Sequence, residues 1–324
     1  MKRFANPENI ELPVALFLAS DKYNGNLPGY SATGLIKPIR QTILTSRITA
    51  TTNTPINLVD GLRSRVGSAI HAALEDAWLD SPEQALEALG LPAGIRSRIL
   101  VNPAPQDVKP DSLPIYLEQR TSKDVDGVTV HGQYDIVFQG EVQDLKTTSV
   151  FQFSKQNKVE AFTLQGSIYR WLNPELITKD TLAIHYLLLD WSASRTRDPA
   201  YPKSPVITTR YPLMSPERTL IWIRQRLAAL AAMKTAHDSE LPECTDEELW
   251  RSEPVFKYYK NPTSKSRSTA NFDTLAEAQA RLAKDGHIGV IEEKKGEVRA
   301  CRWCPAAGIC QQRARLVAAG ELPE

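Results

Sequence analysis

The sequence lacks the features that would mark a membrane protein or an exported one. None of its apolar runs is long enough to span a bilayer, and the apolar stretch at 14–19 is too short for a good signal peptide. An excess of one charge is also lacking. The 39 basic and 38 acidic side chains give a formal net charge of +1, so any nucleic-acid surface has to be local. We expect a cytoplasmic protein that does not bind membranes.

Cysteine is scarce, and none occurs before position 244. Cys301, Cys304 and Cys310 form a C-x2-C-x5-C pattern, and Cys244 stands apart from them. In a reducing cytoplasm such a group indicates a metal rather than disulfides. Four thiolates can hold an Fe4S4 cluster or a tetrahedral zinc ion, and the spacing does not choose between them. Cysteines that bind no metal are the alternative.

The order of apolar patterns indicates an α/β core, a mixed central sheet flanked by helices. The composition, 42% hydrophobic and 24% charged, is ordinary for a globular chain. From about residue 241 the sequence contains all four cysteines and a basic hairpin. We therefore expect a core domain of residues 1–240 and a small cysteine-containing lobe of 241–324. Predicted helices cover 60–79, 157–172 and 216–235, and predicted strands cover 113–120, 128–138, 141–148, 181–191 and 206–212.

Residues 133–148 are the centre of this pattern. Asp135 lies in the first of two predicted strands, and Asp144 and Lys146 lie in the second. Residues two apart on a strand face the same side, so Asp144 and Lys146 share a face, and strand pairing can bring Asp135 beside them. Two carboxylates and an ammonium suit a divalent metal that activates water. A surface hairpin with scattered charges is the simpler alternative.

Other polar residues recur at helical or strand spacing. His71 shares a helix face with Glu75, and Gln165 shares one with Tyr169. His71 could be a ligand, and Gln165 and Tyr169 could bind a carboxylate or a phosphate. A structural histidine and ordinary polar residues on a helix are the alternatives. Glu118, on the strand before the hairpin, is a possible third carboxylate, or it could pair with nearby basic residues.

Two stretches carry basic residues without acids. Lys155 and Lys158 follow the central hairpin, and a predicted hairpin at 255–272 interleaves basic and aromatic residues. Such a surface suits backbone tracking and base stacking on DNA. A solvated hairpin that uses its aromatics for packing is the alternative. The candidate DNA contacts in this hairpin are Lys257, Tyr259, Lys260, Lys265 and Arg267.

In order along the chain, the strings GSAIHAALE, GQYDIV, QDLKT and QGSIY resemble four motifs of the PD-(D/E)XK nuclease superfamily, in its RecB-like exonuclease branch. The resemblance implies a restriction-endonuclease-like fold and a Mg2+ or Mn2+ site. Its ligands would be His71, Asp135, Asp144 and the Leu145 carbonyl, with Glu118 as a possible addition. Lys146 becomes the catalytic lysine, and Gln165 and Tyr169 hold the scissile strand.

The function implied by this resemblance is a metal-dependent deoxyribonuclease, with an exonuclease as the leading prediction. A structure-specific endonuclease and a non-cleaving DNA-binding protein are the alternatives. The chain has no GxxxxGK[ST] loop or other helicase motif, so it resembles a stand-alone phage or prophage exonuclease. That origin implies a bacterial host cytoplasm and a single-strand annealing or recombinase protein as a possible partner.

The late cysteines extend the resemblance to AddB-type and CRISPR-adaptation nucleases, which close an Fe4S4 cluster. Those proteins take the fourth cysteine from a segment similar to SATGLIKPIR, residues 31–40, which has no cysteine here. Cys244 is the remaining one. We expect Cys244, Cys301, Cys304 and Cys310 to hold one Fe4S4 cluster, with zinc as the alternative.

Overall fold

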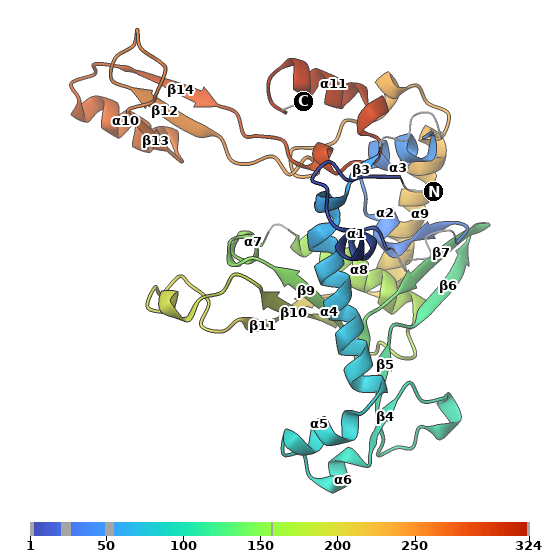
Figure 1. Cartoon of the computed structure of the whole chain (residues 1–324). Coiled ribbons are helices and arrows are strands. Elements are labelled where there is room, and N and C mark those ends of the chain that lie inside the picture. The colour runs from blue at the N-terminus through green and yellow to red at the C-terminus, as the bar shows by residue number, and fades with distance from the viewer. Residues whose placement is uncertain (1–2, 21–26, 49–54, 157, 323–324) are drawn as a thin grey trace. The chain divides into compact units, whose positions relative to one another are not determined.

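The computed structural model describes residues 3–20, 27–48, 55–156 and 158–322 (Figure 1). The chain divides into two compact units, one of residues 1–36 and 55–228, the other of residues 37–54 and 229–324. The sequence predicted a single boundary after residue 240 instead. Residues 37–54 join the second unit because Arg40 of α3 (Ile39–Ser46) and Arg47, the residue that caps its C-terminus, donate hydrogen bonds to six backbone carbonyls between residues 233 and 242.

The first unit is built on a six-stranded mixed sheet. The pairs β9–β10 and β4–β5 are parallel, and the other neighbours are antiparallel. This confirms the predicted α/β class with a mixed central sheet. The strand order is β11 (Val206–Pro212), β10 (Thr181–Leu188), β9 (Glu141–Thr148), β8 (Ile136–Phe138), β5 (Leu113–Leu117), β4 (Ile99–Val101).

One long antiparallel hairpin leaves this sheet and enters a second one. Beyond β5 and β8 it continues as β6 (Arg120–Val125) and β7 (Val128–Gln133), and β7 also pairs with β2 (Tyr30–Ser31). The predicted strand 128–138 is therefore wrong as one element, since it breaks at Tyr134 and Asp135. The opposite strand breaks at Glu118, whose backbone is left-handed with a φ of 49°. Tyr134 is fully buried at the break and donates a hydrogen bond to the Gln119 side chain at 2.9 Å.

Two helices pack against the central strands, and glycine sets how closely they approach. A Cβ on Gly67 in α4 (Leu62–Leu79) would lie 3.3 Å from Thr147 Oγ1 of β9. A Cβ on Gly166 in α8 (Val159–Leu172) would lie 3.1 Å from Leu182 Cδ2 of β10. Both helices were predicted, and each carries one of the motifs into contact with the sheet (Figure 1).

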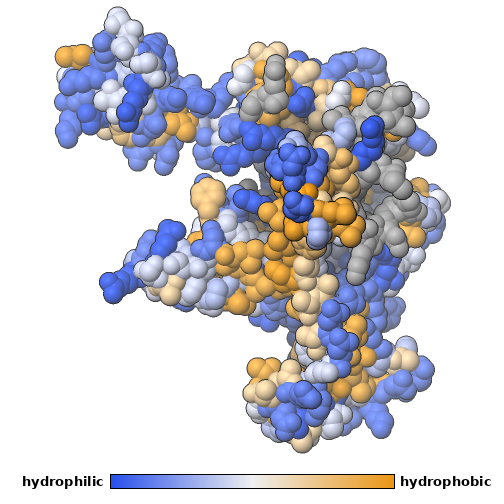
Figure 2. Space-filling view, viewed as in Figure 1, coloured by the Kyte–Doolittle hydropathy of each residue, from blue (hydrophilic) through white to orange (hydrophobic). Residues whose placement is uncertain are grey.

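The remaining elements of the first unit are shorter or peripheral. Figure 2 shows hydrophobic side chains gathered over α1 and α4, where Leu12, Leu16 and Leu62 are exposed. No described helix combines the length and apolar composition needed to cross a membrane. The remaining elements of the first unit are β1 (Phe4–Ala5) paired with β3 (Ile56–Asn57), α1 (Leu12–Ala19), α2 (Ala32–Leu35), α5 (Pro82–Ala88), α6 (Ala93–Arg96), α7 (Val150–Lys155) and α9 (Pro216–Met233). The last residues of α9 belong to the second unit.

The second unit contains a three-stranded sheet and a short C-terminal helix. The predicted hairpin at 255–272 is formed by β12 (Val255–Tyr259) and β13 (Ala270–Phe272), and β14 (Val290–Lys294) adds a third strand. Helix α10 (Leu275–Lys284) begins at a capping box of Thr274 and Glu277. A small apolar core of Leu249, Val298 and Leu322 packs against Cys244, Cys301 and residues of α11 (Gln311–Ala318).

Candidate metal centre and cysteine cavity

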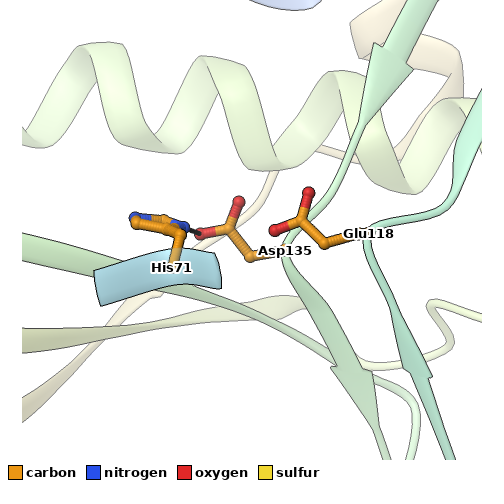
Figure 3. Close-up of side chains that lie close together, drawn as sticks. All are labelled: His71, Glu118 and Asp135. Atoms are coloured by element: carbon orange, nitrogen blue, oxygen red, sulfur yellow. Dashed lines mark ion pairs between the residues drawn. The ribbon is translucent and has the colours of Figure 1, made fainter. Parts of the chain in front are cut away.

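The break in the long hairpin gathers three candidate metal ligands. Continuing the β5–β8 register places Glu118 directly opposite Asp135, and the Glu118 amide donates to the Asp135 carbonyl at 2.9 Å. His71 reaches Asp135 from α4, with Nδ1 at 3.3 Å from Oδ2. One ligand atom from each of His71, Glu118 and Asp135 lies within 4.8 Å of the other two, with Asp135 in the middle (Figure 3). Glu118, the possible third carboxylate, thus lies close to the candidate ligands His71 and Asp135.

Asp144 and Lys146 lie next to this group on β9. Continuing the β8–β9 register places Asp144 opposite Asp135, and the Leu145 amide donates to Asp135 Oδ2 at 3.1 Å. The Lys146 Nζ lies 2.5 Å from Asp144 Oδ2. That oxygen is shielded from solvent and makes no hydrogen bond of ordinary geometry within the described residues. A buried oxygen of this kind is suited to a bound cation.

The electrostatics also fit a cation. Burial, followed by repulsion from Asp135, raises the pKa of Glu118 to about 7 against a hydrogen bond from Gln133 that lowers it. Burial raises the pKa of Asp144 against the opposing charge of Lys146, and Asp135 adds to the increase. Crowded carboxylates therefore resist ionisation until a positive charge joins them. Imidazole and carboxylate oxygens match Mn2+ well, and the oxygens also match Mg2+.

Lys146 has aromatic neighbours that the sequence did not indicate. Its ammonium lies 5.8 Å from the centre of the Phe162 ring, and Phe162 and Phe153 both pack on Tyr186 of β10. Burial lowers the pKa of Lys146, but the charges of Asp144 and Asp135 outweigh burial, so the net pKa is raised. Lys146 is therefore held as a cation. Its pairing with Tyr186 depends on the parallel β9–β10 register, which no local pattern reveals.

Gln165 and Tyr169 lie on α8 and contact each other. The Gln165 amide donates to the Tyr169 hydroxyl at 2.7 Å, and Tyr169 is buried. Tyr169 and Leu172 occupy the space where a Cβ on Gly132 of β7 would clash at 2.9 Å. The two residues form one polar unit on the helix, as their spacing predicted. A contact with the scissile strand stays a prediction.

After β9, the basic residues Lys155 and Lys158 are accompanied by an aromatic one. Phe151 of α7 is 59% exposed, and the Lys155 ammonium lies 5.4 Å from the centre of its ring. The loss of surrounding solvent and the charge of Lys146 lower the pKa of Lys158. Lys158 therefore lies in the electrostatic field of Lys146. Phe151 was missed from the sequence because one exposed aromatic on a short helix has no periodic signal.

In the second unit, the aromatic residues of the hairpin bear on the choice between base stacking and packing. Tyr258 and Tyr259 are both buried, which agrees with the alternative in which the aromatic residues serve packing, and a contact of Tyr259 with DNA stays a prediction. Lys257 is half-buried opposite Glu292, and Lys265 forms an ion pair with Glu292. The exposed loop between β12 and β13 carries Lys260, Lys265 and Arg267 without an acid, and Figure 2 shows this part of the chain as mostly hydrophilic.

All four cysteines line one cavity in the second unit. The space between the lining side chains is about 310 Å³, part of it open to solvent. Burial raises the pKa of Cys244 to about 12 and that of Cys301 to about 11. The charge of Glu248 and then those of the other three cysteines contribute to the raised Cys244 pKa. The other lining residues include Arg40, Leu44, Leu249, Gln312 and Arg313.

The spacing of the sulfurs at this cavity differs from the spacing of thiolates on a single tetrahedral ion. Thiolates on one tetrahedral zinc lie about 3.8 Å apart, as follows from a Zn–S bond of about 2.3 Å. Among the described residues, no three thiol sulfurs lie within 4.8 Å of one another. The Arg313 Nε is buried and lacks a hydrogen-bond partner in the described part of the chain. An N–H donor at the cavity wall suits the sulfur atoms of a cluster.

Comparison with known proteins defines the family. The model of the PD-(D/E)XK nuclease superfamily matches residues 50–311, most of the chain, and the protein belongs to that superfamily. The curated proteins give no match. The solved structure titled SSO0001 is 12% identical, with 72% of this chain and 92% of that chain covered and a TM-score of 0.38.

A phage related exonuclease from Haemophilus somnus 129PT is also 12% identical. The comparison covers 66% of this chain and 96% of that one, with a TM-score of 0.28. TM-scores this low carry no argument about this chain. The family assignment therefore rests on the superfamily model, which confirms the resemblance found in the four motifs.

Proposed function

We propose that the protein is a metal-dependent deoxyribonuclease that degrades DNA from an end. Membership of the superfamily makes it a hydrolase of phosphodiester bonds with DNA as the implied substrate. The observation that carries the metal dependence is the meeting of His71, Glu118 and Asp135 beside the Asp144–Lys146 pair. Membership of the superfamily does not imply that the reaction requires a DNA end. That requirement is tested separately with closed circular DNA.

The residues around this centre have separable roles. His71, Glu118 and Asp135 would hold Mg2+ or Mn2+, with Asp144 and the Leu145 carbonyl completing the ligand set. When bound, the ion supplies Lewis acidity and activates water for phosphodiester hydrolysis. Lys146, held as a cation by Asp144, stabilises negative charge on the phosphate. Gln165 and Tyr169 position the DNA strand.

Lys146→Ala is the direct test of this assignment. Removal of a charge that stabilises the transition state should slow cleavage of linear DNA with Mn2+ by about 10²–10³-fold. Lys109→Ala is the matched control, because Lys109 is an exposed lysine of the same unit. Cleavage by Lys146→Ala at the rate of the control would remove the proposed mechanism.

Closed circular DNA separates the exonuclease from an endonuclease. A chain that requires an end should leave the circle intact and degrade the same DNA after linearisation. Cutting of the closed circle would favour the endonuclease. Binding without cleavage of either form, with Mg2+ and with Mn2+, would favour the non-cleaving alternative. Interaction with an annealing or recombinase protein stays a prediction.

For DNA binding we assign phosphate contacts to two basic elements. The exposed β12–β13 loop offers Lys260, Lys265 and Arg267, and α7 offers Lys155, with Lys158 after it. Phe151 is the exposed ring available for base stacking beside Lys155. Because the aromatic side chains of β12 are packed inside, the loop would contact the backbone and not the bases.

We also propose that Cys244, Cys301, Cys304 and Cys310 hold an Fe4S4 cluster. The shared cavity, the wide separation of the sulfurs and the unpaired Arg313 Nε support a cluster over zinc. Protein purified without oxygen should be brown and contain iron and acid-labile sulfide. Stoichiometric zinc without iron would reject the cluster and keep a structural metal.

A further inference from the structure

Cys244 reaches the cavity from a different part of the chain than the other three cysteines. Cys301, Cys304 and Cys310 lie close together in sequence, so short loops can gather them. Cys244 has no such connection. A contact in the folded chain has to bring its sulfur to the cavity and fix it there.

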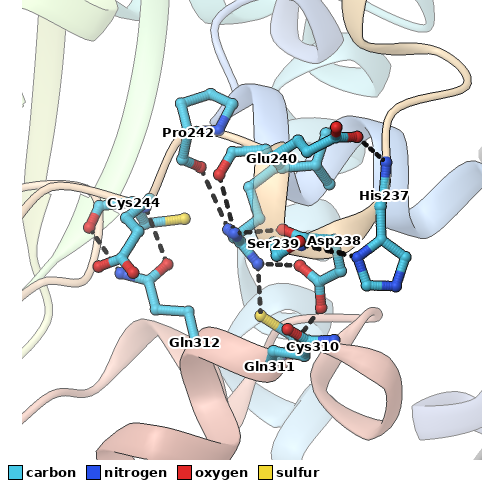
Figure 4. A network of polar contacts seen from close by, with 12 residues as sticks. His237, Asp238, Ser239, Glu240, Pro242, Cys244, Cys310, Gln311 and Gln312 are labelled. Atoms are coloured by element: carbon cyan, nitrogen blue, oxygen red, sulfur yellow. Dashed lines mark hydrogen bonds and ion pairs between the residues drawn. The ribbon is translucent and has the colours of Figure 1, made fainter.

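Gln312 makes that contact. The Cys244 amide donates to Gln312 Oε1 at 2.8 Å, and Gln312 Nε2 donates to the Cys244 carbonyl at 2.9 Å (Figure 4). The side chain of Gln312 is buried and lines the cavity. Both ends of the amide therefore hold the backbone of one residue, and the Cys244 thiol takes no part in either bond. A primary amide is the one neutral side-chain group that offers a donor and an acceptor in this arrangement.

The helix turn that carries Gln312 also carries Cys310. Cys310 is the N-cap residue of α11, and the Gln311 amide beside it donates to Asp238 Oδ2 at 2.7 Å. Asp238 is ion-paired with the buried Arg40, whose Nη1 lies 3.9 Å from Cys310 Sγ. This second anchor fixes the turn independently of Cys244. Because Gln312 lies on the same turn as Cys310 and binds the backbone of Cys244, it fixes Cys244 relative to Cys310.

We propose that Gln312 is the positioning residue that makes Cys244 the fourth ligand of the cluster, an inference that rests on the cluster proposed above. A buried amide that only stabilises the fold is the alternative. Both alternatives predict some loss of stability when Gln312 is changed. Only the positioning role predicts that one iron of the cluster becomes labile while the other three stay bound.

The experiment compares anaerobically purified wild type with Gln312→Ala, Gln312→Glu and Cys244→Ser. Gln311→Ala is the matched control, because the Gln311 side chain is exposed and only its backbone amide is used. Ferricyanide takes one electron from [Fe4S4]2+, and the resulting [Fe4S4]3+ releases Fe2+ to leave [Fe3S4]+. The readouts are iron per chain and the electron paramagnetic resonance signal of the three-iron form.

Gln312→Ala should release that iron about 10–100-fold faster than wild type, the usual effect of removing a partner that orients a metal ligand. It should therefore approach Cys244→Ser, while Gln311→Ala behaves as wild type. Gln312→Glu keeps the acceptor for the Cys244 amide, so its rate of iron release should lie between those of wild type and Gln312→Ala. If Gln312→Ala does not fold, the comparison of Gln312→Glu with wild type decides the test. Iron release at the wild-type rate in both Gln312 variants would overturn the positioning role alone. A wild type without iron would overturn the cluster proposal and this inference with it.

Discussion

The metal centre of the first unit and the cysteine cavity of the second are built in opposite ways. At the metal centre, backbone ladders place Glu118, Asp135 and Asp144 opposite one another, and the side chains repel. At the cysteine cavity, side-chain hydrogen bonds from Gln312 and Arg40 hold loops that no ladder connects. We therefore expect the loss of a ligand at the first site to cost little stability, and the loss of a support at the second site to cost more.

Asp135→Asn should produce the largest functional effect of this comparison. The change removes a ligand carboxylate, so Mn2+ affinity should fall by more than about 100-fold, beyond the usual loss for a partner outside the ligand shell. Cleavage of linear DNA should be lost with it. The melting temperature should stay the same or rise, because repulsion with Glu118 and Asp144 is relieved.

Calorimetric titration with Mn2+ and a thermal melt check both parts of this prediction. Asp126→Asn is the control, since Asp126 is an exposed turn residue paired with Arg224. A large loss of stability in Asp135→Asn would show that the metal centre supports the fold, and the contrast between the two sites would fail.

Arg40→Met should have the largest effect on stability. The change leaves Asp238 buried without its cation and removes the donor from three backbone carbonyls. Breaking a buried ion pair from one side costs about 3–5 kcal/mol. Arg47→Met is the comparison, because within the described part of the chain Arg47 donates to backbone carbonyls and pairs with no carboxylate. Equal denaturant midpoints for the two variants would contradict the special role of Arg40.

Glu141→Gln tests a buried charge of the first unit that lies outside the metal centre. Burial alone would raise the pKa of Glu141, but hydrogen bonds from Arg210 and Thr181 and the Arg210 charge outweigh burial and lower the pKa. A group whose pKa is lower in the folded state stabilises the fold at pH values above its unfolded-state pKa. This stabilisation is lost as the pH falls through the folded-state pKa.

The variant should therefore be less stable than wild type by about 1 kcal/mol at pH 7. The difference should shrink as the pH falls below the usual range of a glutamate. Urea unfolding at a series of pH values measures both. A difference that stays constant down to acid pH would mean that the Glu141 charge contributes nothing.

The smallest expected effect concerns the β12–β13 loop. Lys260→Ala with Arg267→Ala removes two phosphate contacts, so the slope of log K against log salt should fall by about 2. Cleavage rates at saturating DNA should be unchanged, because the metal centre is intact. Lys284→Ala in α10 is the control for charge alone. An unchanged salt slope would remove the loop from the DNA surface.

The local sequence determined which candidate site residues share a face within β9, α4 and α8. Period-two alternation places Asp144 and Lys146 on one face of β9, and helical spacing places His71 on α4 and joins Gln165 to Tyr169 on α8. The ordered motifs gave the superfamily, and the bounds of β11 agree with the predicted strand. These features depend on neighbours within one or two turns of the chain, which is the range over which side-chain periodicity operates.

Tertiary structure decided the rest. The hairpin breaks at Glu118 and Tyr134–Asp135 because it changes sheets there, and this break brings Glu118 to His71. The burial of Tyr259 and the Gln312–Cys244 contact likewise depend on partners far away in the sequence. Side-chain alternation fixes which way a residue faces within its element. Which elements meet, and where a strand bends, follows from packing the whole chain at once, because burial is shared among segments that no local pattern connects.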